Sequence, residues 1–557
     1  MIIPKDDKKR LDFYREVSEV CLASRATRIE RYGQNRRYFL YGTTDGTMSP
    51  WNKIYSHLDT VTSFLYASDS TRFSAKLGLM APQSDYPKAP VFAKKINESW
   101  KQSNADIIFQ QAILWALVYD TTIVKHIRRG KSIEPFLIDP GSFGVYREDV
   151  PMLDRQEAFV QVYYMTKSDL AARLALHPRR EDILKNAEAT MVKQDTAAAM
   201  PPLMQRVTIN SMLPAPNMSG EVNVNLTAIP EYNAEIATDV VEMHEQYIWN
   251  SEIDDYQVVT MAGGQVVVYD RPNFFMPRST GFEPEHGFVQ VCPNPLYDYF
   301  WGVSEVSRLS VLQDRRNSRM DDITRLLAKQ VDPPSAWGGM GIPEEKLRAF
   351  NEPGAALYLG DAMNMKRETF APNIPQDIYA DVRQIDQEFD DVSGLTNTLS
   401  GRGESGVRSG GHAARLLTVG SSRPKKRALI IEDSLEKSAD LYGKCIYIGD
   451  DAELVDEDGH KFVIAQMSTH FSIEVDAHSN SPVFTEDQMQ KAELLFKTKC
   501  IDRETFVKMV NPPMQEAIIH NLKTKIIPAE QKAAAAQQQA AAAAAAAKKG
   551  GKPDESK

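Results

Sequence analysis

Cysteine is scarce in this chain, and no two cysteines form a paired motif. The 557 residues contain four, Cys21, Cys292, Cys445 and Cys500, which are far apart with no CxxC pair. The sequence therefore supports neither a disulfide framework nor a zinc site, and a reducing compartment is expected. Long apolar runs are also missing, because 112–119 is too short to cross a bilayer and residues 1–10 are too charged for a signal peptide. We expect a protein made and used in the cytoplasm, with no membrane partner.

The motifs of several enzyme classes are missing as well. The sequence contains no HExxH, no GxxxxGK followed by Ser or Thr, and no GxSxG, and its ten histidines are scattered. Gly401, Gly403 and Gly406 do spell GxGxxG, but they follow a helix and a Thr/Asn/Ser stretch instead of a strand, with no βαβ pattern around them. We therefore predict no catalytic, cofactor-binding or metal-binding residues. An enzyme that uses this glycine loop is an alternative, which nucleotide binding measured by calorimetry would test.

What is present is the composition of a folded protein with several domains. The chain has 42% hydrophobic and 25% charged residues, and its net charge of −10 argues against a simple nucleic-acid coat. Any contact with DNA must be local. Helices are predicted over 6–32, from Ser49 onward and over 92–127, strands over 132–165 and 240–270, and an extended loop over 201–232. We predict an α+β fold, mainly helical, with a mixed α/β body over 1–300.

Two amphipathic helices follow this body. The first covers about 301–330, and Asp332, Pro333 and Pro334 end it. The second covers 374–393, and its apolar residues step by four and three along one narrow seam, which predicts packing against a neighbouring helix: Ile378, Val382, Ile385, Phe389 and Val392. Six carboxylates fall off this seam and predict an acidic outer face: Asp377, Asp381, Asp386, Glu388, Asp390 and Asp391.

Between the two helices lies a compact insert, 331–373, rich in proline and glycine with two short strand-like runs, 355–359 and 365–370. Helices that leave and return to such an insert lie side by side. The first helix, at about 1.5 Å per residue, would hold the insert about 40 Å from the body.

A glycine-rich loop, 394–411, and a basic segment follow the second helix. Seven cations against the single Glu404 predict intermittent contact with phosphates: Arg402, Arg408, Arg415, Arg423, Lys425, Lys426 and Arg427. A solvated basic helix start explains the same pattern equally well. We further predict a long helix kinked at 420–424 with return strands, all within 412–484, then helices within 485–530 and a low-complexity tail over 531–557.

The order of these parts resembles the portal, or head-to-tail connector, proteins of tailed bacteriophages, particularly those of short-tailed phages. The resemblance lies in PNPLYDYFWGVSEVSRLSVLQDRRNSRMDDITRLLAKQVDPP (293–334), the insert, IPQDIYADVRQIDQEFDDVSGLTN (374–397), the glycine loop and the long helix. FLIDPGSFGVYRED (136–149) extends it loosely over 1–512. It implies a wing (1–300), stem helices (301–330 and 374–393), a clip (331–373), a tunnel loop (394–411) and a crown from 485.

The resemblance also implies a function. Portal proteins form rings of about twelve copies at one capsid vertex, at the head–tail junction of the virion, and have no enzymatic activity of their own. The implied partners are further copies of the chain, double-stranded DNA, the terminase, tail adaptor proteins, the capsid and a scaffold protein. In such a ring the six carboxylates are candidates for the channel wall. A head–tail adaptor or another virion structural protein is the alternative.

Overall fold

The structure is a computed structural model of the whole chain. It describes residues 1–45, 47–66, 71–78, 81–130, 132–187, 240–333, 335–337, 356–358, 367–369, 376–394, 422–449, 452–456, 459–475, 482–510, 518–519 and 521–522. The chain divides into two compact units, Met1–Asp476 and Ala477–Lys557. The fold mixes helix and sheet, as predicted. The expected loop over 201–232 lies outside the described residues.

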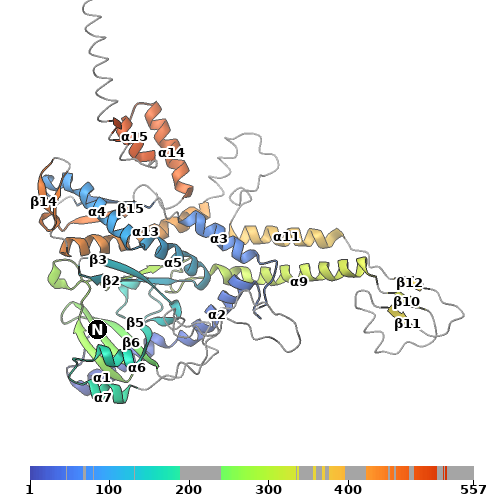
Figure 1. Cartoon of the computed structure of the whole chain (residues 1–557), viewed down its shortest axis with the longest axis horizontal. Helices are drawn as coiled ribbons and strands as arrows, with labels where there is room; N and C mark the ends of the chain where they lie inside the picture. The colour runs from blue at the N-terminus through green and yellow to red at the C-terminus, as the bar shows by residue number, and fades with distance from the viewer. Residues whose placement is uncertain are drawn as a thin grey trace, which may run out of the picture. The chain divides into compact units, whose positions relative to one another are not determined.

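A five-stranded antiparallel sheet forms one part of the first unit (Figure 1). Its order is β4 (Phe143–Val145), β5 (Ala158–Thr166), β6 (Val240–Asn250), β7 (Asp255–Ala262) and β8 (Val266–Pro272). Gly263 and Gly264 both have positive φ, which allows the tight turn between β7 and β8. Helix α1 (Asp7–Leu22) packs Tyr14 and Val17 against the sheet, and α6 (Lys167–Arg173) and α7 (Arg180–Asn186) cover another part of it.

A three-stranded antiparallel sheet, in the order β3 (Ser132–Ile138), β2 (Thr122–Arg129) and β9 (Phe288–Val291), forms a second part. It contacts α5 (Ala105–Tyr119) and the long helix α13 (Ser422–Gly449). His126 of β2 joins sheet to helix, because its Nε2 lies 2.6 Å from the hydroxyl of Ser438 in α13. Burial lowers the pKa of His126 to about 4, so the imidazole is neutral and structural.

The remaining elements of the first unit surround these sheets. Strand β1 (Phe73–Leu77) pairs with β15 (Phe471–Val475), and this ribbon contacts α4 (Ala89–Gln102) and α13. Strand β13 (Glu453–Val455) pairs with β14 (Lys461–Val463), while α2 (Arg25–Tyr41) and α3 (Lys53–Leu65) contact α5. Short 3₁₀ helices occur at Gln83–Lys88, Pro140–Ser142, Leu153–Arg155, Arg278–Thr280 and Ile464–Gln466.

Helices α9 (Glu305–Val331) and α11 (Gln376–Ser393) form a pair and run side by side in Figure 1. Their bounds agree with the predicted helices to within a few residues. Between them in the sequence is a small sheet in which β10 (Ser335–Trp337) pairs in parallel with β11 (Ala356–Tyr358) and antiparallel with β12 (Arg367–Thr369). The predicted helix–insert–helix order is therefore present, although most of the insert lies outside the described residues.

The second unit contains α14 (Pro482–Lys497) and α15 (Arg503–Val510), close to the predicted helices. The rings of Phe496 and Phe506, with centroids 4.7 Å apart, pack the two helices together.

Three predicted elements were wrong in their bounds. The single helix expected over 6–32 is two helices, because the chain breaks at Ala23 and Ser24 between α1 and α2. The helix expected over 92–127 is also two helices, α4 and α5, separated at Ser103 and Asn104, and α5 ends at Tyr119, because Asp120 has a φ of 119° and the β-branched residues after it form β2. The helix expected from Ser49 onward begins at Lys53, because its N-cap is Asn52, whose side chain accepts from the backbone N–H of Tyr55. The kink expected at 420–424 stays a prediction, because the structure describes α13 from Ser422 and 412–421 lies outside the described residues.

Candidate functional site

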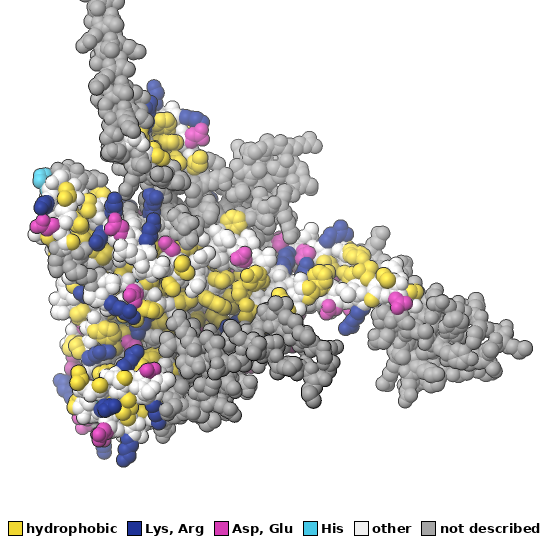
Figure 2. All heavy atoms as spheres, in the orientation of Figure 1, with side chains coloured by type: hydrophobic (Ala, Val, Ile, Leu, Met, Phe, Trp, Pro, Cys, Tyr) yellow, Lys and Arg dark blue, Asp and Glu magenta, His cyan; other side chains and the backbone are white. Residues whose placement is uncertain are grey.

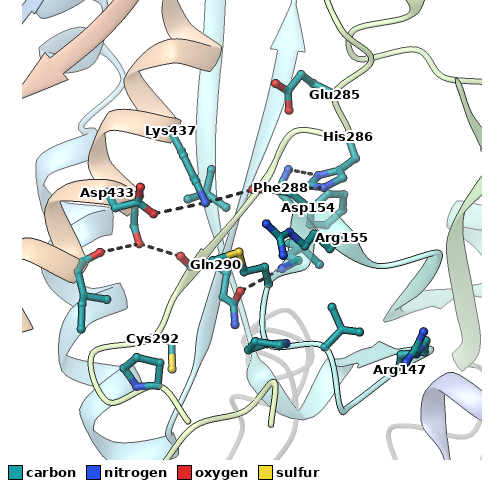
Figure 3. A pocket seen from close by; sticks show the side chains of 18 of the residues that line it. Arg147, Asp154, Arg155, Glu285, His286, Phe288, Gln290, Cys292, Asp433 and Lys437 are labelled. Carbon is teal, nitrogen blue, oxygen red and sulfur yellow. Dashed lines mark hydrogen bonds and ion pairs between the residues drawn. The ribbon is translucent and has the colours of Figure 1, made fainter. Parts of the chain in front are cut away.

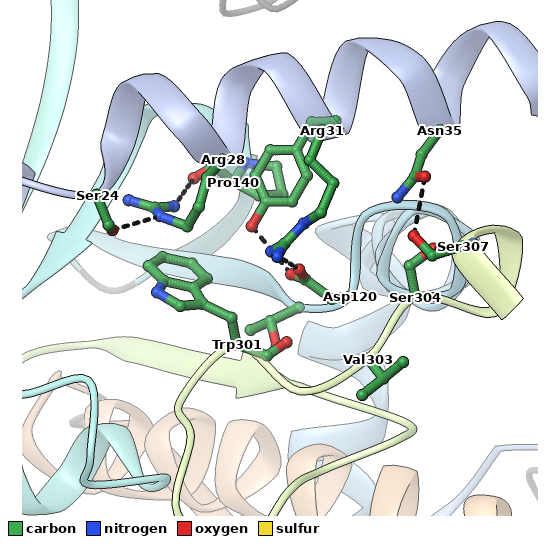
Figure 4. Close-up of polar contacts among 12 residues, drawn as sticks. Ser24, Arg28, Arg31, Asn35, Asp120, Pro140, Trp301, Val303, Ser304 and Ser307 are labelled. Carbon is green, nitrogen blue, oxygen red and sulfur yellow. Dashed lines mark hydrogen bonds and ion pairs between the residues drawn. The ribbon is translucent and has the colours of Figure 1, made fainter. Parts of the chain in front are cut away.

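The start of α9 is fixed to the body by its N-cap. Ser304 accepts a hydrogen bond from the backbone N–H of Ser307 at 3.3 Å, while its own hydroxyl donates to the carbonyl of Val118 at 2.6 Å. Ser307 donates in turn to Asn35 of α2 at 3.0 Å (Figure 4). The first turn of α9 is thereby attached to both α5 and α2.

Trp301, just before this cap, is fully buried and held by polar contacts as well as packing. The guanidinium of Arg28 lies over its indole, 3.7 Å from the ring centroid, and the indole N–H donates to Glu148 at 2.8 Å. Figure 4 shows Arg28 and Trp301 facing each other below α2. Thr121 donates to the carbonyl of Trp301 at 2.6 Å, so the entry to α9 is fixed from three sides.

A buried carboxylate lies beside this entry. Asp120 accepts hydrogen bonds from Arg31 at 2.6 Å and from the hydroxyl of Tyr32 at 2.9 Å. Burial raises the pKa of Asp120 to about 7, against the opposing effects of Arg31, Tyr32 and Arg28. The carboxylate joins α2 to the break between α5 and β2.

The seam predicted on α11 faces α9 over part of its length. Ile385 and Phe389 are fully buried, Ile378 and Val382 are partly buried, and Val392 is 45% exposed. The interhelical ion pairs join residue 315 to 381 and 388, 316 to 386, and 319 to 381, so the two helices run antiparallel. Two of the five predicted seam residues are therefore fully buried, and Phe389 packs against His57 of α3.

The carboxylates of α11 depart from the expected acidic outer face, because cations of neighbouring helices lie against four of them. Asp381 accepts from Arg315 at 2.8 Å and from Arg319 at 2.6 Å, while Glu388 also contacts Arg315, at 3.2 Å. Asp386 contacts Arg316 at 3.0 Å, and Asp390 contacts Lys53 at 3.0 Å. The physical reason is their position: 381, 386 and 388 flank the seam, where charged side chains of paired helices meet.

Asp377 and Asp391 complete the predicted acidic set, and both are exposed. Figure 2 shows the consequence, with hydrophobic, basic and acidic side chains interspersed over the α9–α11 pair.

Lys53, at the first residue of α3, ties the body to α11. Its ammonium lies 3.0 Å from Asp390, 3.3 Å from Asp386 and 4.9 Å from the centroid of the Phe389 ring. Its backbone N–H donates to Gln313 of α9 at 2.9 Å. Sequence reasoning missed this residue, because no pattern links α3 to a helix more than 300 positions away.

Most of the predicted DNA-contact residues cannot be placed. Arg402, Arg408 and Arg415 lie outside the described residues, and the side chain of Arg423 is not described either. Lys426 is exposed near the start of α13, and Lys425 is partly buried. Arg427 differs from the rest, because its guanidinium donates to the buried carboxylate of Glu305 at 2.9 Å. The side chain of Arg427 therefore points into the protein and is not one of a series of solvated cations.

A cavity of about 1300 Å³ opens between the 147–155 segment, β9 and α13 (Figure 3). Its charged residues contact one another, as Lys437 does with Asp154 at 3.1 Å and with Asp433 at 3.3 Å. Burial lowers the pKa of His286 to about 4, so this imidazole is neutral. The Lys437–Asp154 pair joins α13 to the 3₁₀ helix at Leu153–Arg155, and the hydroxyl of Ser434 joins it to β9 by donating to the carbonyl of Gln290 at 2.9 Å.

Two further findings concern the described part of the chain. Within it, no group of three or more His, Cys, Asp or Glu side chains could hold a metal ion. None of its helices combines the length and apolar character needed to span a bilayer.

Comparison with known proteins gives limited help. No protein-family model and no curated protein matches the chain. Among the solved structures that match, one is described as the virion of a native gene transfer agent particle, with a TM-score of 0.38 and 8% identity, over 82% of this chain and 89% of that chain. A TM-score this low does not establish a shared fold, so function must be argued from this chain's own geometry.

Proposed function

We propose that this chain is a virion structural protein of the portal type, which forms a ring around a channel for double-stranded DNA. The observation that carries the proposal is the α9–α11 pair, two antiparallel helices with the β10–β11–β12 sheet inserted between them and α13 following. This is the order that the resemblance to portal proteins implies. In that reading the pair is the stem and the small sheet belongs to the clip.

Exposed apolar side chains on the pair support contact with further copies. Val311 and Val331 of α9 are 73% and 85% exposed, and Tyr379 and Val392 of α11 are also exposed. A cyclic ring brings two unlike faces of the same chain together, so each copy must present apolar surface on both sides of the pair. We propose about twelve copies, from the resemblance alone.

The DNA-facing surface is proposed to be close to neutral along the pair. Duplex DNA carries one charge per about 1.7 Å, and a wall of unpaired cations around it would bind tightly enough to prevent sliding. Arg315, Arg316 and Arg319 are each neutralised by carboxylates of α11, which leaves few net charges to hold or repel DNA. Contact with phosphates is assigned to the loop cations Arg402 and Arg408.

The remaining partners follow from this role. A ring at a capsid vertex, at the head–tail junction, would bind the terminase during packaging, tail adaptor proteins afterwards, and the capsid and a scaffold protein during assembly. ATP hydrolysis would belong to the terminase, so the chain is proposed to have no enzymatic activity. A non-portal head–tail adaptor is the second candidate, favoured if the chain does not close into a ring.

Electron-microscope images of the purified chain test the proposal. The expected result is a population of rings with a central opening wide enough for duplex DNA. Only monomers at every concentration, or rings closed at the centre, would overturn it.

The loop contact has its own test in particles that carry this chain. Arg402→Glu and Arg408→Glu together should shorten the packaged DNA or reduce its retention, while rings still form. Lys8→Glu and Lys9→Glu, at exposed positions of α1, provide a charge-matched control. Unchanged packaging in the loop variant would remove Arg402 and Arg408 from the proposal.

A further inference from the structure

Glu305, the first residue of α9, is a carboxylate with 0% exposure whose two oxygens face different elements. Its Oε2 accepts from Arg427 of α13 at 2.9 Å and from the amide of Asn294 at 3.4 Å. Its Oε1 faces Nε2 of His57 in α3, at 3.7 Å. One side chain therefore lies where α3, α9 and α13 meet.

The carboxylate is stable there only because cations compensate for its burial. Burial by itself would raise the pKa of Glu305, but His57, Arg427 and Arg308 outweigh it and hold the pKa below its ordinary value. Its position at the N-terminal end of α9 also favours a negative charge, because the helix dipole is positive there. The side chain of Arg427 is only 11% exposed, so removing either partner would leave a buried charge without compensation.

On the side of Glu305 that faces α3, the hydrogen bonding is incomplete. Among the described residues, neither Glu305 Oε1 nor His57 Nε2 has a hydrogen-bond partner, although both atoms are buried. Buried polar atoms are rarely left in this condition, and their separation exceeds a hydrogen bond by less than about 1 Å. The His57 ring packs edge-on against Phe389 of α11, with centroids 5.9 Å apart, so this gap is also in contact with the α9–α11 pair.

We propose that Glu305 is a positioning residue that fixes the start of α13 to the base of α9 through Arg427, with His57 as its second partner, donating from Nε2 to Oε1. Glu305, Arg427, Asn294 and His57 together are called the Glu305 brace. The brace connects the pair proposed as the stem to the helix that follows the proposed tunnel loop. Its role in DNA passage rests on the proposed function, but its existence can be tested without it.

Hydrogen exchange in the full-length chain tests the Arg427 contact. Glu305→Gln keeps the shape of the side chain and removes its charge, and we expect amides in 428–436 of α13 to exchange at least about tenfold faster. Arg427→Gln should give the same result, Arg427→Lys a smaller one, and the double variant no more than the larger single effect. Equal effects for Arg427→Lys and Arg427→Gln, or additive effects in the double variant, would overturn the proposal.

A matched control is available in the sheets. Glu245 forms a buried ion pair with Lys125 at 3.0 Å, with both side chains 12% exposed. Glu245→Gln should speed exchange in β5 and β6 and leave 428–436 of α13 unchanged. Faster exchange in α13 in this control would mean that loss of any buried pair loosens the whole unit, which would overturn the assignment to Glu305.

The role of His57 needs a variant that keeps its ring. His57→Phe preserves packing against Phe389 and removes the Nε2 donor, so we expect faster exchange in 54–62 of α3 and no further increase when Glu305→Gln is added. Unchanged exchange in α3 would show that His57 only packs, and the brace would then reduce to Glu305 and its α13 and Asn294 contacts.

The link to DNA passage is measured separately. Arg427→Gln should still give rings in the electron microscope but shorten the packaged DNA in particles. If the unmodified chain forms no rings, the proposed function fails, while the exchange results still decide whether the brace exists. If rings form and packaging by Arg427→Gln is normal, the brace has no part in DNA passage.

Discussion

The base of α9, at Glu305, has a buried ion pair, whereas the outer part of α9, at Arg315 and Arg319, has exposed ion pairs with α11. Glu305 is completely buried with Arg427, while Arg315 and Arg319 remain about half exposed in their pairs with Asp381. A buried pair cannot lose one partner without leaving an uncompensated charge, whereas water and salt replace much of an exposed one. The base of α9 should therefore resist movement, and the outer part should tolerate rearrangement of its ion pairs.

The largest effect is expected where the base enters the body. Trp301→Ala removes a fully buried indole together with its contacts to Arg28 and Glu148, and should lower the free energy of unfolding by about 4–5 kcal/mol. Urea denaturation followed by circular dichroism measures it. Tyr297→Ala is the control, because Tyr297 is 96% exposed and should cost less than about 0.5 kcal/mol. Similar losses of unfolding free energy in the two variants would contradict the expectation that the base of α9 is held rigidly.

The seam between the helices should give the next largest effect. Phe389 is fully buried against His57 and below Lys53, so Phe389→Ala should cost about 3 kcal/mol. Val392→Ala, on the same helix but 45% exposed, should cost less than about 1 kcal/mol. The same denaturation experiment compares them. A larger loss for Val392 in the isolated chain would mean that the seam is misassigned.

The sequence predicted only part of this difference between the base and the outer part of α9. The 4–3 spacing of Ile378, Val382, Ile385 and Phe389 predicted which side of α11 is buried, because local periodicity records the buried face of a helix. The partners of the charged residues could not be predicted from periodicity. Asp381 and Glu388 were assigned to an outer face, although the paired helices bring Arg315 against them, and this depends on register between segments separated by an insert.

The base was less predictable still. Glu305 and Arg427 are more than 100 residues apart in the sequence. Arg427 was predicted to contact DNA, and no role was predicted for Glu305. Lys53 and His57 come from α3, whose packing against α9 and α11 depends on tertiary structure alone. The sequence places Glu305 directly after the N-cap Ser304, where an acidic residue is common. No local sequence rule predicts that such a residue is buried.

The free energy of unfolding should depend on pH through Asp120, which lies beside the base of α9. A raised folded-state pKa means that this group stabilises the fold fully below its ordinary pKa of 3.8, and that this contribution is lost as pH rises through about 7. The free energy of unfolding of the native chain, minus that of Asp120→Asn, should therefore fall between about pH 4 and pH 7 and then level off. Taking the difference cancels other titrating groups, including Asp139. A flat difference would show that Asp120 titrates normally.

The smallest effect belongs to the exposed ion pairs of the outer part. Arg319→Ala removes the contacts with Asp381 and Asp322, all of which lie in water-accessible positions. We expect a small loss of stability that is largest at low salt and shrinks as ionic strength rises, because salt ions and water screen an exposed ion pair. Arg427→Ala, at the base, should be damaging at both salt concentrations, because salt does not reach a buried pair. Denaturation at two ionic strengths compares the two. If Arg319 matters equally at high salt, the outer part is held as firmly as the base, and the division of α9 into a fixed and an adaptable half fails.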